Sequence, residues 1–215
     1  MCNLYRMTSN VEAIARLFKV DTGGVNLPAF PAVYPDREAP VVRQDADGAR
    51  HLVIMRWGFP PPPGVARPVT NVRNLSSPFW HGALANPERR CLVPVTAFSE
   101  WSAAPDPVTG KKRIHWFGMA DPDDVPFAFA GLWRPQPGEM SRMAFLTCAP
   151  NALVGRIHPK AIPVIVPRDR YADWLAAGIH VVTPNKHAGA GSRERWRRIH
   201  AAGAGGARFR YEATV

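Results

Sequence analysis

Short apolar runs bounded by turn-forming residues recur along this chain and restrict it to a fold built from short strands. The clearest example is the pair of runs at residues 41–42 and 52–55, which flank Asp47-Gly48, a dipeptide typical of β-hairpin turns. Such runs, without an internal repeat, indicate a mainly antiparallel β core. Further strands are predicted at residues 91–95, 114–119, 127–132, 143–147 and 162–166.

Helices are predicted to be few and peripheral. Ser9 and Glu12 have the spacing of a capping box, and apolar residues with helical spacing follow, so a helix is expected from Ser9 to Gly23-Gly24. We therefore expect an α+β fold with peripheral helices. Because 46% of the 215 residues are hydrophobic, a single domain over residues 1–215 is expected. Two more short helices are predicted at residues 151–157 and 168–175.

The chain is strongly basic. It has 27 Lys and Arg against 17 Asp and Glu, a formal net charge of +10 and a pI near 10.3. This balance favours a polyanionic partner, nucleic acid above all, although solubility through net charge explains it equally well. The Gly/Ala-rich segment 184–215 fits a solvated tail as well as a phosphate-binding surface. Its arginines are Arg193, Arg195, Arg197, Arg198, Arg208 and Arg210.

The three cysteines do not have the spacing of a disulfide framework or of a structural zinc site. Cys91 and Cys148 lie in apolar runs, where we expect them to be buried. No metal-ligand spacing occurs, so we expect neither a metal nor another cofactor. The chain also has no run of about 18 apolar residues and no signal-peptide pattern at its start. We therefore expect a cytoplasmic protein without membrane contact.

Cys2 differs from the other cysteines because it is second in the chain. Removal of Met1, which methionine aminopeptidase performs before small side chains, would leave Cys2 with a free α-amine beside its thiol. Their ordinary pKa values, about 7.7–8.0 and about 8.5, leave both groups partly nucleophilic near neutral pH. The amine can condense with an aldehyde to an imine, and the thiolate can then close a five-membered thiazolidine. By position alone, however, Cys2 is better explained as an incidental surface residue.

Four sequence blocks change that balance, because together they resemble the SOS-response-associated-peptidase (SRAP) family, whose members process abasic sites. The resemblance covers residues 1–175 and implies an SRAP-like fold with a barrel-like sheet. Each block is a modest signal, whereas four blocks in order with cysteine second are specific. The blocks are Met1-Cys2-Asn3-Leu4-Tyr5, Thr70-Asn71-Val72-Arg73-Asn74, residues 91–101 with Phe98-Ser99-Glu100-Trp101, and residues 157–165 with Ile157-His158-Pro159.

The resemblance implies catalytic roles at the matching positions. Cys2 would be the nucleophile, and Asn71 would hold the processed N-terminus by hydrogen bonding. Glu100 would transfer protons beside the Cys2 amine. His158 would be the acid that opens the deoxyribose ring to the aldehyde, or it would assist the imine chemistry. The chemistry agrees, because a closed abasic sugar hides its aldehyde as a hemiacetal and histidine titrates near pH 6.5.

The resemblance also implies contacts to DNA. Arg73 would bind a backbone phosphate, while Trp57 and Phe59 would pack against bases next to the lesion. Many relatives begin Cys-Gly-Arg, whereas Asn3 stands here at the glycine position. The phosphate contact of that early arginine is therefore missing from its usual place, and Arg6 is a candidate substitute.

Each residue taken singly has an ordinary structural explanation, and only the joint pattern favours function. These explanations are a turn for Asn71, a strand-end surface carboxylate for Glu100, a loop histidine for His158, one of many solvated arginines for Arg73, and the core for Trp57 and Phe59.

Three functions stay open. The expected one is capture of abasic sites in single-stranded DNA by a covalent cross-link to Cys2, which protects the lesion, with strand cleavage by β-elimination as a side activity. The second is a thiol autopeptidase in which Cys2 removes Met1. The third is a non-catalytic single-stranded nucleic-acid-binding module. We expect a monomer that joins the nucleoid when it binds DNA.

Overall fold

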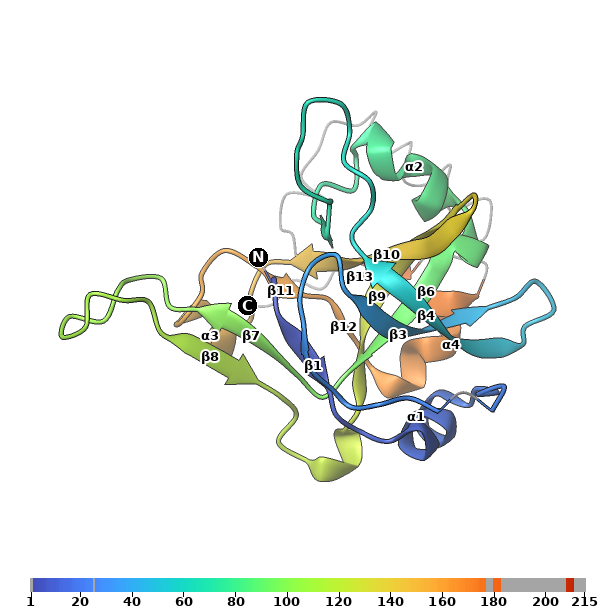
Figure 1. Cartoon of the computed structure of the whole chain (residues 1–215), viewed down its shortest axis with the longest axis horizontal. Helices are drawn as coiled ribbons and strands as arrows, with labels where there is room; N and C mark the ends of the chain where they lie inside the picture. The colour runs from blue at the N-terminus through green and yellow to red at the C-terminus, as the bar shows by residue number, and fades with distance from the viewer. Residues whose placement is uncertain (1, 25, 177–179, 183–207, 211–215) are drawn as a thin grey trace.

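A closed five-stranded barrel forms the centre of the protein (Figure 1). The computed structural model describes residues 2–24, 26–176, 180–182 and 208–210. The ring closes because β10 pairs in parallel with β4 on one side and antiparallel with β9 on the other. The expected α+β class with a mainly antiparallel, barrel-like core is therefore confirmed. The barrel strands are β3 (Glu38–Gln44), β4 (Arg50–Trp57), β6 (Arg90–Val95), β9 (Phe127–Gln136) and β10 (Glu139–Cys148).

Three two-residue strands extend the barrel edge. β5 (Asn71–Val72) pairs in parallel with β10, while β11 (Ile162–Pro163) pairs antiparallel with the end of the same strand. β12 (Ile165–Val166) pairs with β9. The predicted strand over 162–166 is thus two strands that pair with different neighbours. This arrangement brings β5 and the chain before β11 to the same end of β10.

A second sheet has the strand order β2-β1-β7-β8. Its β7 and β8 form a hairpin that projects from the barrel on the left of Figure 1. β8 matches a prediction, whereas β1, β2 and β7 were not predicted as strands. The strands are β1 (Tyr5–Met7), β2 (Phe30–Val33), β7 (Ala97–Trp101) and β8 (Ile114–Phe117).

The first helix, α1 (Val11–Phe18), differs from its prediction at both ends. Its N-cap is Asn10, whose side chain accepts a hydrogen bond from the backbone of Ala13, rather than Ser9. It ends at Lys19, which adopts the left-handed conformation with φ 52°, well before the glycine pair.

The other helices are short and lie outside the barrel, as predicted, but α2 was missed. The predicted helix over 168–175 consists of a 3₁₀ turn followed by α4. The helices are α2 (Pro78–Ala85), α3 (Ala152–Gly155), α4 (Tyr171–Leu175) and the 3₁₀ turns Pro87–Arg89, Pro122–Asp124 and Arg168–Arg170. No helix among the described residues is long and apolar enough to span a membrane.

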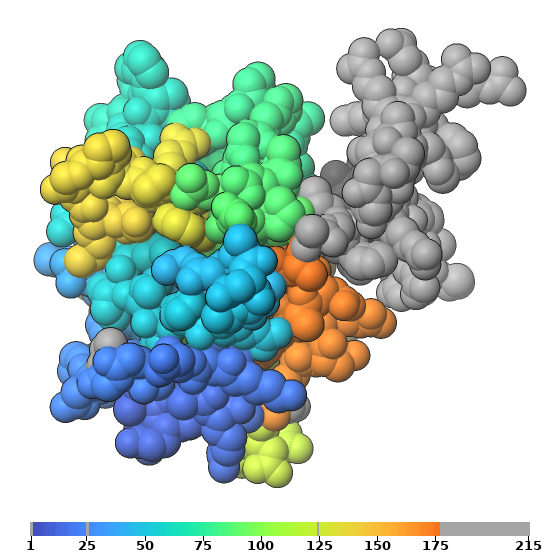
Figure 2. All heavy atoms as spheres, turned by 90° about the vertical axis from the view of Figure 1, so that its right-hand side faces the viewer, coloured from blue at the N-terminus to red at the C-terminus, as the bar shows by residue number. Residues whose placement is uncertain are grey.

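The barrel strands bury apolar side chains on both of their faces. One face packs against helices, with Phe18 of α1 stacked on Tyr171 of α4 at 5.0 Å between ring centroids. Figure 2 views this helical side, with α1 at the bottom and residues 165–176 in orange. The other face packs against the second sheet. The apolar cluster between them includes Cys2, Tyr5 and Phe98.

After residue 176 the structure describes only β13 (His180–Val182) and β14 (Arg208–Arg210), which pair in parallel. The arginines at 193, 195, 197 and 198 lie outside the described residues, so the basic tail stays a prediction.

Candidate active site

Cys2 is buried rather than exposed on a free N-terminal arm, which corrects the expectation of an accessible thiol. Its side chain is only 1% exposed and packs with Tyr5 in the core. The thiol Sγ lies 3.5 Å from the carbonyl oxygen of Leu4. Burial, followed by the nearby charge of Glu100, raises the pKa of the Cys2 thiol to about 12. In this state the thiol is therefore protonated at neutral pH, not partly ionised as its ordinary pKa suggested.

Strand pairing places Glu100 beside Cys2. Tyr5 of β1 lies opposite Phe98 of β7, and the Leu4 carbonyl accepts hydrogen bonds from both the backbone and the hydroxyl of Ser99. Glu100 follows on β7 and is 2% exposed. Burial raises the pKa of the Glu100 carboxyl to about 7, because the charged form loses its water. A carboxyl with this pKa can both give and take a proton near neutral pH.

His158 completes an acid–base pair with Glu100. Its Nε2 lies 3.5 Å from the carboxylate Oε2, and its Nδ1 lies 3.1 Å from the carbonyl oxygen of Trp101. Because a carbonyl only accepts, Nδ1 carries a proton and Nε2 faces Glu100. Burial lowers the pKa of His158, which favours the neutral imidazole at neutral pH.

The segment that carries His158 is fixed on both sides. After α3 the backbone N–H of His158 donates to the carbonyl of Val154 at 2.7 Å, and Ala103 donates to Ile157 at 2.8 Å. The imidazole is therefore anchored to the end of β7, where the loop to β8 begins. This rigidity suits a group that must meet a reacting atom in a set position.

Asn71 holds the backbone of Cys2. Its Nδ2 donates to the Cys2 carbonyl at 3.2 Å and to the Thr70 hydroxyl at 2.8 Å. The parallel pairing of Asn71 with Phe145 of β10 fixes its position. The Oδ1 atom of Asn71 is buried and has no hydrogen-bond partner among the described residues. The amide thus contacts Cys2, and its expected role of holding the processed N-terminus stays a prediction.

Arg73 lies at the edge of this cluster. Its Nη1 donates to the carbonyl of Lys160 at 2.8 Å, and the side chain is exposed. Lys160 is also exposed and follows His158 by two residues. Two positive charges therefore border the buried cluster on its solvent side. Cys2, Asn71, Glu100 and His158, with Arg73 beside them, come from four separate parts of the chain.

Comparison with known proteins places this chain in a family. The model of SOS response associated peptidase (SRAP) matches residues 1–193. The chain belongs to the SRAP family. This membership associates it with the SOS response to DNA damage. No curated protein matches the sequence.

Two solved structures resemble this SRAP chain in fold. One is a crystal structure of a protein from Bordetella bronchiseptica, with TM-score 0.65 and 24% identity over 82% of this chain and 89% of that one. The other is a phage-related protein from the same organism, with TM-score 0.62, 20% identity and 81% of both chains covered. At these identities the likeness shows the fold alone.

Trp57 and Phe59 do not present rings to solvent, which corrects the expectation that they stack on bases. Both side chains are fully buried. The Trp57 ring stacks on Phe145 at 5.0 Å, and its Nε1 donates to the Thr70 carbonyl at 3.1 Å. Phe59 packs against Trp80 of α2 at 5.2 Å. Trp57 therefore supports the chain next to Asn71 from inside the SRAP core.

The exposed rings near the site are different ones. Trp101, next to Glu100, is 42% exposed, and Trp116 on β8 is 38% exposed. The alternation of Ile114 and Trp116 within a predicted strand indicates that they share one face of it. Whether that face meets solvent depends on the pairing of the strand with β7, which the sequence does not show. Both tryptophans belong to the β7–β8 hairpin. The backbone carbonyl of Trp101 in this hairpin contacts His158.

The cluster has no built metal site. Among the described residues, no group of three or more His, Cys, Asp or Glu side chains is arranged to hold a metal ion.

Proposed function

We propose that this SRAP protein captures abasic sites in single-stranded DNA by a covalent bond to Cys2. One observation carries the proposal: Asn71 holds the backbone of Cys2 at the point where the buried Glu100, paired with His158, approaches it. The residues around a simple buried thiol would be apolar, whereas these are the groups that imine chemistry uses.

The reaction needs the α-amine of Cys2, so Met1 must first be removed. The amine then attacks the sugar aldehyde, and the resulting carbinolamine loses water to give an imine. The thiol sulfur adds to the imine carbon, and its proton passes to the ring nitrogen. The balance is one aldehyde plus one aminothiol, giving one thiazolidine and one water. Because burial keeps the thiol protonated, the amine, with an ordinary pKa of about 7.7–8.0, reacts first.

The pKa values favour Glu100 over His158 as the main proton carrier. A pKa of about 7 lets the Glu100 carboxyl remove a proton from the ammonium and return one to the departing hydroxyl. His158 has a lowered pKa, so its charged form is scarce at neutral pH. His158 then serves to orient Glu100 and to relay a proton when the sugar ring opens.

The test is a cross-linking assay with single-stranded DNA that carries one abasic site. Wild-type protein is expected to give an adduct that survives denaturation, with a mass equal to DNA plus the chain without Met1 minus water. Cys2→Ala removes the thiol and is expected to give no stable adduct. Cys148→Ala is the matched control, because Cys148 is a half-buried thiol at the end of β10. Equal yields from wild type and Cys2→Ala would falsify the proposal.

An autopeptidase acting on Met1 is the second candidate, because the same cluster lies beside Cys2, to which Met1 is joined in the sequence. The N-terminal mass of purified wild type and Glu100→Ala separates the two ideas. Loss of Met1 in the wild type alone supports self-processing, whereas loss in both variants assigns the cleavage to the cell's aminopeptidase.

A further inference from the structure

A buried hydroxyl shares its hydrogen-bond acceptor with the Cys2 thiol. Ser99 on β7 is 1% exposed, so its hydroxyl has left water and needs a partner inside the protein. That partner is the carbonyl oxygen of Leu4, 3.2 Å away. The backbone N–H of Ser99 donates to the same oxygen at 3.0 Å. The N–H bond alone continues the pairing of β1 with β7, so the bond from the hydroxyl is an addition to the strand ladder.

The Leu4 carbonyl also accepts a hydrogen bond from the Cys2 thiol, whose Sγ lies 3.5 Å away. Three donors therefore converge on one carbonyl oxygen, which has two lone pairs. The thiol is the weakest of the three, because S–H is a poor donor. Leu4 is 7% exposed, so a donor that leaves this oxygen is not readily replaced by water. The carbonyl thus holds the thiol weakly while both donors of Ser99 stay in place.

Ring closure requires the thiol to leave this carbonyl. The sulfur must turn to the imine carbon and form the C–S bond, and its proton passes to the nitrogen as the C=N double bond becomes a single bond. Asn71 meanwhile holds the Cys2 carbonyl at 3.2 Å, so the backbone stays in place while the side chain turns. A carbonyl that keeps two donors loses little when the third departs, whereas a buried carbonyl left with one donor loses more.

We propose that Ser99 is a positioning residue that releases the Cys2 thiol for ring closure. Its hydroxyl keeps the Leu4 carbonyl satisfied, and the thiol then turns to the imine carbon at little cost. The inference rests on the proposed function, because there is a ring to close only if an abasic sugar forms an imine with Cys2. It concerns the second step alone, since the hydroxyl acts on the thiol and not on the amine.

A second hydroxyl on the same strand pair provides the matched control. The backbone N–H and the hydroxyl of Thr96 donate to the Arg6 carbonyl at 2.8 and 3.2 Å, which repeats the arrangement of Ser99 with Leu4. Thr96 is also hydrogen-bonded to Thr8. Thr96→Ala therefore loses at least as many bonds between β1 and β7 as Ser99→Ala does. A purely structural role of these hydroxyls would make the two variants equally slow.

The test follows the two steps separately, with single-stranded DNA that carries one abasic site. Sodium borohydride reduces an imine to a stable amine, and the added hydrogen distinguishes this product from the thiazolidine by intact mass. In Ser99→Ala the imine should form at the wild-type rate, whereas ring closure should be about threefold to tenfold slower, the effect of one hydrogen bond. The fraction trapped as reduced imine should rise accordingly. Thr96→Ala should match the wild type in both steps.

Ser99→Thr keeps a hydroxyl and should close the ring within about twofold of the wild-type rate. Thermal melting checks that each variant is folded. Ring closure at the wild-type rate in folded Ser99→Ala, or equal slowing in Thr96→Ala, overturns the role of Ser99. A Ser99→Ala chain that does not fold overturns it too, because the hydroxyl is then structural. A wild type that yields neither imine nor thiazolidine contradicts the proposed function itself, which is distinguishable because Ser99 is intact there.

Discussion

Glu100 links the stability of the protein to the protonation of its site. Burial raises the pKa of this carboxyl from its ordinary 4.5 to about 7. Between pH 4.5 and pH 7 the folded protein therefore keeps a proton on Glu100 that the unfolded chain has already released. The contribution to stability is therefore complete below pH 4.5 and is lost as the pH rises through 7. The residue that is suited to move protons is thus also one that destabilises the fold when it is charged.

Glu100→Gln should remove this dependence, because the amide has the shape of the protonated acid but does not ionise. Between pH 5 and pH 8 the free energy of unfolding of the wild type should fall by up to about 3 kcal/mol through this group, at 1.36 kcal/mol per pKa unit. Urea denaturation at a series of pH values measures this. Glu12→Gln, at an exposed position of α1, is the control and should follow the wild-type curve. A Gln variant as pH-sensitive as the wild type would contradict the burial argument.

At the scale of residues, sequence blocks predicted the site better than its surroundings. Asn71, Glu100 and His158 lie in short blocks whose order carries the resemblance, and the structure brings them together around Cys2. The burial of Cys2 was not predictable, because it depends on β1 pairing with β7 more than 90 residues away. Trp57 was misread for the same reason. An aromatic residue before a Pro-rich loop is compatible with either face of a strand until its neighbours are known.

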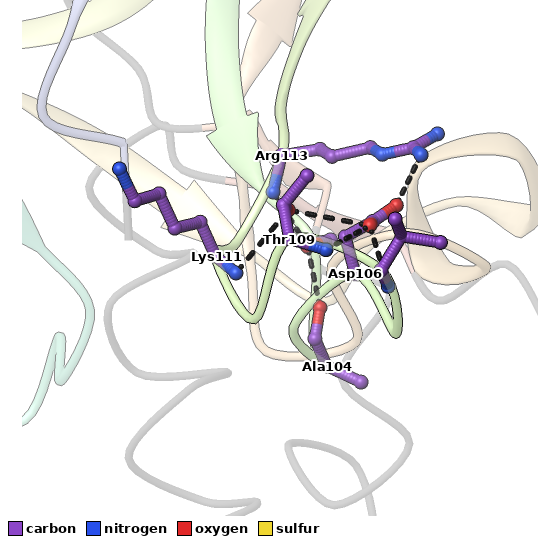
Figure 3. A network of polar contacts seen from close by, with 7 residues as sticks. Ala104, Asp106, Thr109, Lys111 and Arg113 are labelled. Atoms are coloured by element: carbon purple, nitrogen blue, oxygen red, sulfur yellow. Dashed lines mark hydrogen bonds and ion pairs between the residues drawn. The ribbon is translucent and has the colours of Figure 1, made fainter.

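In the β7–β8 hairpin, one side chain makes most of the contacts that order the turn. Asp106 holds the turn through bonds to Val108 and Thr109 and through the ion pair with Arg113 (Figure 3). Hydrogen bonding from the Thr109 backbone lowers the pKa of Asp106, as expected for a carboxylate that accepts several N–H groups.

Asp106→Ala should loosen this turn while the barrel stays folded. Hydrogen exchange at the amides of Val108 and Thr109 should become at least about tenfold faster, since each lost hydrogen bond is worth on the order of 1 kcal/mol. Asp121→Ala removes a comparable cap from the turn at residues 122–124 and should accelerate exchange at Asp123 alone. Unaltered protection at Val108 and Thr109 would show that the loop is ordered without Asp106.

Prediction of elements succeeded where apolar pattern and turn chemistry agreed. The hairpin around Asp47-Gly48 is present as β3 and β4 because both signals point to one structure. β7 was missed because Ser99 and Glu100 interrupt its apolar pattern, and of these two Glu100 faces the site. α2 was missed because it presents no polar face that would mark a helical period, and its sequence is PFWHGALA.

The barrel depends on close packing between its strands at Gly131. A Cβ at this position would lie 2.6 Å from the sulfur of Cys91 and 3.1 Å from a methyl group of Val93. Gly131 also lies opposite both Cys91 on β6 and Phe145 on β10, so it occupies the place where β9 joins both neighbours. No signal in the sequence marks this glycine as different from the others, because its constraint comes from the closed ring.

Gly131→Ala should therefore lower the free energy of unfolding by about 2 kcal/mol, the usual range for overpacking a core. Gly82→Ala in α2 is the matched control, since a Cβ there meets nothing within 4 Å and alanine favours a helix by about 0.5–1 kcal/mol. Chemical denaturation should thus move the two midpoints in opposite directions. If the two variants shifted together, the close approach of β9 and β6 would not limit stability.

The position of β1 has a mechanical consequence. β1 is hydrogen-bonded on both sides, to β2 and to β7, and it begins three residues after Cys2. A DNA strand joined to Cys2 would pull on the protein through this short tether. Tension along the strand would be shared among the ladder bonds on both flanks, which lie across its direction. A polymerase or helicase colliding with the adduct would then have to shear an interior strand before the protein gave way.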